Sequence, residues 1–79
     1  MDWHEHITTD PKTCHGSPCI RGTRVLVSAV LDDLAAGRSF EQVRASHAGL
    51  NDEDIRAAIA YAADLAHREN IVPFLPGAL

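Results

Sequence analysis

The sequence has little of several features that mark large classes of protein. Its 79 residues include two cysteines, too few for the disulfide framework of a small secreted domain. No run approaches the ~18 consecutive apolar residues of a membrane span, and the N-terminus lacks a basic region followed by an apolar run. The sequence therefore predicts a cytoplasmic protein with reduced thiols and no membrane association.

Aromatic and basic residues are also scarce. Aromatics make up 5% of the chain, and seven Lys and Arg residues face eleven Asp and Glu residues, which gives a formal net charge of −4. Such an acidic chain carries no general electrostatic signal for nucleic acid. A chain of this length buries only about 60 to 65% of its unfolded surface, so its own core gives marginal stability. We expect one domain, residues 1–79, that forms a homodimer.

Residues that would support metal binding or catalysis are loosely arranged. Five side chains suit zinc and lie near one another in the sequence: His4, His6, Cys14, His15 and Cys19. Their spacing is irregular and a second ligand pair is missing. Nucleophilic catalysis by a thiol also needs a base beside it and a pocket for substrate, and neither follows from this sequence. We expect no enzymatic activity, no metal and no cofactor.

Turn-forming residues punctuate the first part of the chain, residues 1–26. Between them lie short pieces compatible with β-structure, at residues 7–8, 19–20 and 23–26. Gly22 can adopt the positive φ that a tight turn demands. The sequence predicts an irregular N-terminal arm with strand character and a hairpin or bend at Arg21–Gly22.

From residue 27 the spacing of apolar residues becomes helical. The first helix has an apolar stripe at Val27, Val30, Leu31 and Leu34. Gly37 is placed to end it in the left-handed conformation. Ser39 and Gln42 fit a capping box that begins a second, brief helix, which ends near Ser46 and has Phe40 and Val43 on its apolar face.

A third helix is predicted to begin after Asn51, a residue suited to the N-cap, with Leu50 and Ile55 spaced as a hydrophobic staple. Carboxylates in its first turn and basic residues in its last complement the helix dipole. Its expected buried stripe is Ile55, Ala58, Ile59, Ala62 and Leu65 or Ala66, with Tyr61 at the edge, while Ala57, Ala60, Ala63 and Asp64 are expected on the outer face. The three helices over residues 27–69 predict an all-α, helix-turn-helix core of winged-helix or homeodomain-like type with a short N-terminal β arm.

An apolar, uncharged tail follows at residues 70–79. Its two prolines exclude a helix. The side chains that would bind a partner there are Ile71, Val72, Phe74 and Leu75. Two destinations remain open for this tail: the domain's own core or dimer, which gains burial, or a groove on a partner.

The segment from His15 to Val27, with its Ile-Arg-Gly-Thr-Arg centre, resembles the domain of unknown function 433 family. The likeness continues through the ends and starts of the predicted helices and covers about Ile7 to Ala66. Members of that family look like antitoxins of VapB type with a helix-turn-helix fold, frequently paired with a small PIN-like ribonuclease toxin. The resemblance implies a regulator that binds a protein partner.

The third helix is where a helix-turn-helix protein would read DNA. Its N-terminal side chains would face base edges in the major groove, and here they are Asp52, Glu53 and Asp54. Duplex DNA carries one negative charge per ~1.7 Å, so this start is repelled, and Arg56 compensates with a single charge. Both direct DNA reading and a plain helical scaffold remain open.

Six cations are candidates for contacting DNA phosphate or the acidic site of a toxin: Arg21, Arg24, Lys12, Arg38, Arg44 and Arg56. A guanidinium suits phosphate and the carboxylate cluster of a metal-dependent nuclease alike. The alternative is that an arginine pairs with a carboxylate of its own chain, such as Asp10 or Asp32, and holds the arm on the helices.

The combined interpretation is an antitoxin-like component of a type II toxin–antitoxin system, which binds and neutralises a PIN-like ribonuclease toxin. Repression of its own operon through operator DNA is left open. One alternative is a stand-alone helix-turn-helix transcription regulator. Another is a structural dimerisation or interaction module.

Overall fold

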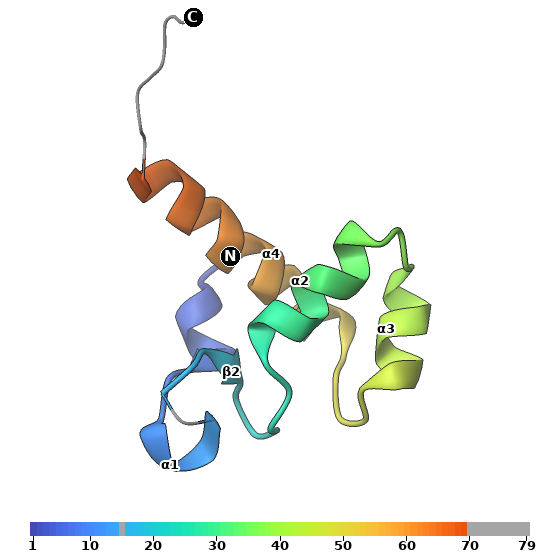
Figure 1. The fold of residues 1–79 in the computed structure, drawn as a ribbon, viewed down its shortest axis with the longest axis horizontal. Helices are drawn as coiled ribbons and strands as arrows, with labels where there is room; N and C mark the ends of the chain where they lie inside the picture. The colour runs from blue at the N-terminus through green and yellow to red at the C-terminus, as the bar shows by residue number, and fades with distance from the viewer. Residues whose placement is uncertain (15, 70–79) are drawn as a thin grey trace, which may run out of the picture.

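A computed structural model of the chain describes residues 1–14 and 16–69. The elements follow in the order η1 (Trp3–Glu5, a 3-10 helix), β1 (Ile7–Thr8), α1 (Pro11–Cys14), β2 (Cys19–Ile20), α2 (Val27–Ala35), α3 (Phe40–Ser46) and α4 (Asp52–Glu69). In Figure 1, α1 and α3 lie at opposite sides of the molecule, with α2 and the start of α4 between them. The predicted three-helix core with an N-terminal β arm is confirmed. Over these residues, no helix has both the length and the apolar character that crossing a membrane requires.

The arm contains a minimal antiparallel sheet. β1 and β2 pair with Ile7 opposite Ile20, at the two positions where the sequence predicts extended chain. Of the third predicted piece, residues 23–26, only Leu26 pairs, in an isolated bridge with Cys19. That piece is therefore not a strand, because the chain is already turning into α2.

The predicted turn at Arg21–Gly22 is confirmed. Gly22 has a φ of +84°, a conformation that glycine adopts without steric cost. The Thr23 N–H donates to the Ile20 carbonyl at 3.0 Å, and the Ile20 N–H donates to the Val25 carbonyl at 2.9 Å. These two bonds close a tight loop that returns the chain to the start of α2.

The two short helices of the arm were not predicted. Asp10 accepts a hydrogen bond from the Lys12 N–H at 2.9 Å, and Pro11 occupies the first helical position, where proline is favoured. Asp2 caps η1 in the same way by accepting from the His4 N–H at 3.0 Å. Both helices begin at an aspartate that caps the first turn. They are too short to show a helical spacing of apolar residues, so the sequence pattern does not reveal them.

The ends of α2 and α3 follow the sequence prediction. Gly37 closes α2 at a φ of +88°, its N–H donating to the Leu34 carbonyl while the Arg38 N–H donates to the Asp33 carbonyl; this pair of bonds is a Schellman motif. The side chain of Ser39 caps α3, and Gln42 returns the bond to the Ser39 N–H. Both signals are local, which is why the sequence locates them correctly.

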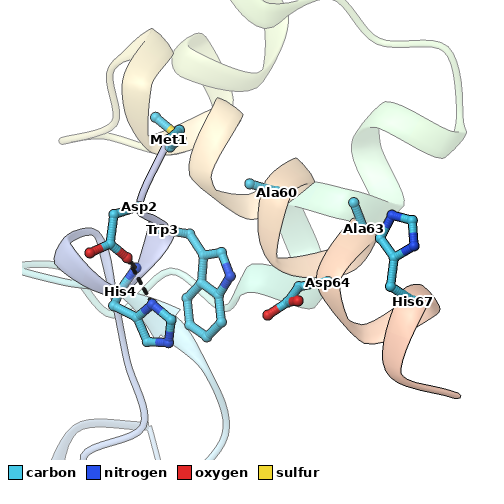
Figure 2. Close-up of a pocket in the computed structure, with 8 residues that line it drawn as sticks. All are labelled: Met1, Asp2, Trp3, His4, Ala60, Ala63, Asp64 and His67. Atoms are coloured by element: carbon cyan, nitrogen blue, oxygen red, sulfur yellow. Dashed lines mark hydrogen bonds and ion pairs between the residues drawn. The ribbon is translucent and has the colours of Figure 1, made fainter.

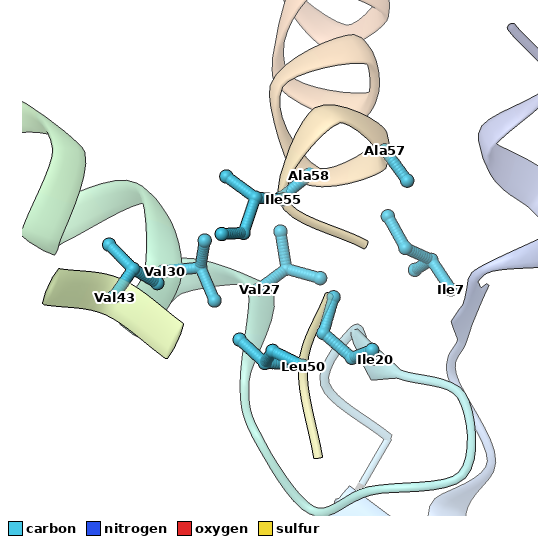
Figure 3. Close-up of a cluster of buried hydrophobic side chains, with 9 residues drawn as sticks. All are labelled: Ile7, Ile20, Val27, Val30, Val43, Leu50, Ile55, Ala57 and Ala58. Carbon is cyan, nitrogen blue, oxygen red and sulfur yellow. The ribbon is translucent and has the colours of Figure 1, made fainter. Parts of the chain in front are cut away.

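One apolar core joins the arm to the helices. Its buried members are Ile7, Ile20, Val27, Val30, Val43, Leu50, Ile55, Ala57 and Ala58. Figure 3 shows Ile7 of the arm beside Ala57 of α4, with Val30 of α2 and Val43 of α3 beyond Ile55. The first turns of α4 are thus enclosed by the arm on one side and by α2 and α3 on the other.

The predicted buried stripe of α4 is partly wrong. Ile59 is 42% exposed and Leu65 is 40% exposed, whereas Ala57, expected on the outer face, is fully buried. The arm covers Ala57, since η1 packs on α4 and the ring of Trp3 meets that of Tyr61 edge-on with centroids 4.8 Å apart. At 1.5 Å per residue, α4 is about 27 Å long and α2 only about 13 Å, so α4 extends beyond its covering.

Truncating Ile55 and Ile59 tests this revised core. We expect Ile55→Ala to lower the free energy of unfolding by about 3 kcal/mol, because it removes buried methyl groups and leaves a cavity. Ile59→Ala, the control four residues along the same helix, should change the free energy of unfolding of the monomer by less than about 1 kcal/mol. Urea denaturation measures both; equal losses would contradict the assigned burial.

Candidate functional site

The first turn of α4 is the point where a helix-turn-helix protein would meet DNA, and its charges are already engaged. Asp52 forms an ion pair with the Arg44 guanidinium, 3.3 Å from Nε. Glu53 pairs with Arg56 at 3.2 Å. The two arginines nearest this helix start are therefore neutralised by its own carboxylates, and the third carboxylate, Asp54, leaves an excess of negative charge.

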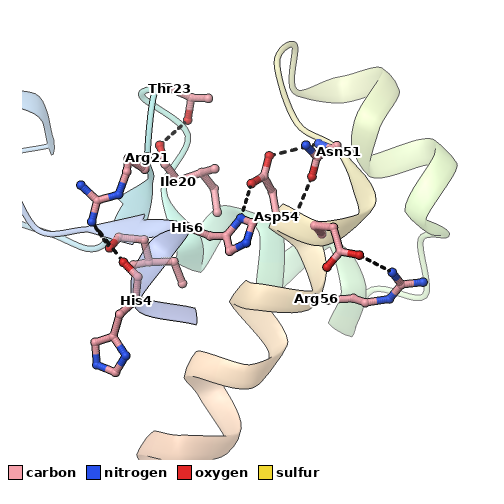
Figure 4. Close-up of polar contacts among 10 residues, drawn as sticks. His4, His6, Ile20, Arg21, Thr23, Asn51, Asp54 and Arg56 are labelled. Carbon is pink, nitrogen blue, oxygen red and sulfur yellow. Dashed lines mark hydrogen bonds and ion pairs between the residues drawn. The ribbon is translucent and has the colours of Figure 1, made fainter. Parts of the chain in front are cut away.

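Asp54 holds the start of α4 and the arm together, as Figure 4 shows. One carboxylate oxygen accepts from the Asn51 N–H at 3.1 Å, while the Asn51 side chain accepts from the Asp54 N–H at 2.8 Å. The other oxygen lies 3.1 Å from Nδ1 of His6. With the two side chains only 13% and 28% exposed, this contact joins the arm to the cap of α4. Asn51 is confirmed as the N-cap, and Leu50 and Ile55 are both buried, as a staple requires.

Arg21, a sequence candidate for partner contact, is instead occupied within the arm. Its Nη2 donates to the carbonyl of His4 at 3.1 Å and to the carbonyl of Ile7 at 3.2 Å. Figure 4 shows the guanidinium of Arg21 directed toward His4. The alternative that an arginine holds the arm in place therefore describes Arg21. Its partners are main-chain oxygens, however, and not a carboxylate such as Asp10 or Asp32.

The remaining cations divide into paired and unpaired. Arg38 lies 3.7 Å from a carboxylate oxygen of Asp33, and Arg44 and Arg56 have the partners given above. In the part of the chain that the structure describes, the side chains of Arg24 and Lys12 make no hydrogen bond or ion pair, and both residues are exposed. Of the six candidates, these two are free to meet an acidic surface.

The turn that carries Arg24 is well braced. The Thr23 hydroxyl donates to the Ile20 carbonyl at 2.8 Å and accepts from the Val25 N–H at 3.0 Å. Its methyl group lies 3.5 Å from the position that a Cβ on Gly49 would take, so the turn packs against the loop before α4. Arg24 therefore projects from a fixed backbone, which lowers the entropic cost of binding through it.

A second histidine–carboxylate pair braces the other end of the domain. Nε2 of His47, which follows α3, lies 2.9 Å from the carboxylate of Asp33 in α2. Both side chains are about three-quarters buried. The contact ties α2 to α3.

A shallow cleft of about 340 Å³ lies between η1 and the outer half of α4. In Figure 2, Trp3 and His4 stand on one side and Asp64 and His67 on the other. The His4 ring stacks on the Trp3 ring, with the ring centroids 3.8 Å apart. Two hydrogen bonds from His4, first that of its side chain and then that of its main-chain N–H, hold the pKa of the Asp2 carboxyl below its ordinary value.

The five residues that would suit zinc are only partly described. Among the side chains that the structure describes, which do not include that of Cys14, no three His, Cys, Asp or Glu groups lie close enough to hold a metal ion. Cys19 is buried, with its thiol directed at the Thr23 carbonyl. His15 lies outside the described residues.

Sequence reasoning missed an apolar groove of about 330 Å³ between the arm, α2 and α4. It is lined by Ser17, Pro18, Val27, Ser28, Leu31, Tyr61 and Leu65. The signal in the sequence that could have found it is Leu65, a large apolar residue near the C-terminal end of the predicted third helix. The tail residues Ile71, Val72, Phe74 and Leu75, expected to bind a partner, lie outside the described residues.

Comparison with known proteins gives a family but no activity. The family model described as "Protein of unknown function (DUF433)" matches residues 7–62. An uncharacterized protein, y4eO of Sinorhizobium fredii (strain NBRC 101917 / NGR234), is 41% identical over 58 residues, which are 73% of this chain and 26% of the relative. The chain thus spans about a quarter of that relative's length. No solved structure matches the chain.

Replacing two adjacent carboxylates separates the structural role of Asp54 from simple charge. Asp54→Ala removes both the bond to the Asn51 N–H and the contact with His6, so we expect a loss of about 2 kcal/mol in the free energy of unfolding. Glu53→Ala, in the same helical turn and with the same charge, removes only an exposed ion pair and should cost about 0.5 kcal/mol or less. Equal costs in chemical denaturation would refute the assignment.

Proposed function

This chain belongs to the DUF433 family, whose function is unknown, and we propose that it acts as the antitoxin-like component of a type II toxin–antitoxin system. In this role it binds and neutralises a PIN-like ribonuclease toxin in the cytoplasm and has no catalytic activity of its own. The observation that carries the proposal is the division of charge described above. Arg24 is unpaired on a braced turn, while the arginines nearest the start of α4 are neutralised.

The charges at the start of α4 favour a protein partner over a DNA groove. Three carboxylates face two arginines there, and both arginines are in ion pairs with the same carboxylates. Opening those pairs to contact phosphate would leave the carboxylates unpaired beside a polyanion. In this proposal α4 serves as a scaffold, and recognition falls to the arm.

Arg24 suits the acidic site of a metal-dependent nuclease. Such a site gathers carboxylates to hold divalent cations, and a guanidinium makes two parallel charge-assisted hydrogen bonds to a carboxylate. An arginine placed there competes with the metal and with the RNA phosphates. Lys12, exposed and unpaired on the same arm, adds a second positive charge toward the partner.

The proposal includes a homodimer. Ile59, 42% exposed, is followed on α4 by Ala63 and Ala66, both exposed and spaced to share its face. These residues leave an apolar strip on the part of α4 that extends beyond the core. A second copy packing on this strip would add the burial that a chain of this size lacks.

A second candidate function is a DNA-binding transcription regulator, with or without a toxin. What favours it is the order of the helices: α3 and α4 form the pair that helix-turn-helix proteins use, and both have capped starts. Repression of its own operon through operator DNA would follow from the same pair. The charges of the first turn of α4 count against this candidate.

Co-expression with the product of the neighbouring gene tests the proposal. We expect the two proteins to co-purify and the chain to rescue growth when that product is toxic. Arg24→Glu should weaken the complex at least tenfold, because it sets a carboxylate against carboxylates. Arg68→Glu is the matched control, because Arg68 is also exposed but lies near the C-terminal end of α4, beside Asp64. Reversing the charge of Arg68 should change the affinity for the partner less than twofold.

Failure to form a complex, together with failure to rescue growth, would reject the antitoxin role. A mobility-shift assay on the DNA upstream of the gene, at two salt concentrations, addresses the second candidate. We expect no shift from the chain alone. A shift that weakens as salt rises would favour the transcription regulator, because loss of affinity with salt marks phosphate contacts.

A further inference from the structure

The apolar groove between the arm, α2 and α4 has no role in the proposed function. It is lined by Val27 and Leu31 of α2, by Tyr61 and Leu65 of α4, and by Pro18 of the arm. Leu65 is 40% exposed, although the hydrophobic effect favours its burial by roughly 25 cal/mol for each Å² covered. None of the described residues that line the groove carries a charged side chain.

The chemistry of the chain's own tail matches this groove. Residues 70–79 carry no charged side chain, and Ile71, Val72, Phe74 and Leu75 give four large apolar groups within five positions. Pro73 and Pro76 exclude a helix and favour extended chain. Extended proline-containing segments dock in grooves that aromatic side chains line, and Tyr61 lines this one.

The place where the tail begins also allows it to reach the groove. Along α4, Leu65 lies about 6 Å and Tyr61 about 12 Å before Glu69, at 1.5 Å for each residue. Residues 70–74 span up to about 16 Å when extended, so Phe74 reaches the level of both side chains if the chain reverses after α4. A tail on the same chain acts at an effective concentration near the millimolar range, which favours it over a second copy at micromolar protein.

We propose that residues 71–75 of the same chain occupy this groove, with the Phe74 ring between Leu31 and Leu65. The tail then covers the exposed part of Leu65, and it connects the outer half of α4 to the core. The groove is accordingly closed to other proteins, which leaves the arm and the Ile59 strip as the surfaces for partners.

A double-mutant cycle in the full chain tests the contact. Leu65→Ser and Phe74→Ser should each lower Tm by about 4 to 8 °C, and the combined variant should lower it little further than Phe74→Ser alone, because both remove one contact. Ile59→Ser is the matched control, since Ile59 is as exposed as Leu65 on the same helix but does not line the groove. Its effect should add to that of Phe74→Ser.

Additive effects of Leu65→Ser and Phe74→Ser, or no change in Tm with Phe74→Ser, would overturn the proposal. Nuclear Overhauser effects from the Phe74 ring supply a second measurement on the unmodified protein, in which Phe40 is the other phenylalanine. We expect contacts with methyl groups of Leu31 and Leu65 within one chain. Contacts found only between labelled and unlabelled chains would assign the groove to a second copy, and no contacts with the groove would refute its occupation; either result overturns the proposal.

Discussion

The structure depends on the burial of the first two turns of α4 between the N-terminal arm on one side and the helices α2 and α3 on the other. Ile55 faces Val30 and Val43, while Ala57 faces Ile7 of the arm. α4 packs on η1, α2 and α3 alike, and the two-residue strands of the arm would not be stable alone. The arm is therefore a structural part of the core as well as a surface.

The polar contacts at the start of α4 serve the same enclosure, and they restrict function. Asp54 caps α4 and holds His6 of the arm, and Arg21 ties the arm together through main-chain carbonyls. The arginines that a DNA-reading helix would offer to the duplex, Arg44 and Arg56, form ion pairs with carboxylates of α4 itself. Among the described residues, Arg24 and Lys12 keep unpaired charges, and the outer half of α4 keeps an exposed apolar surface. In the proposed function these features meet a protein partner.

Local signals explain which parts of the fold could be predicted from the sequence. The capping pairs Ser39–Gln42 and Asn51–Asp54, and the glycine after α2, act within a few residues, so the bounds of the helices follow from them. The burial of Ala57 could not be predicted, because it depends on the arm, some fifty residues earlier. The partners of Arg21 are likewise set by tertiary structure, since any of eleven carboxylates could have competed for it.

Native-state hydrogen exchange most directly tests whether arm and helices form one core. The Arg21 N–H donates to the His6 carbonyl at 2.7 Å across the two strands, and the Ala58 N–H lies inside α4. If the arm is part of the core, both amides exchange only through global unfolding and give the same free energy of exchange. An Arg21 amide that exchanges through a much cheaper local opening, while Ala58 stays protected, would contradict a shared core.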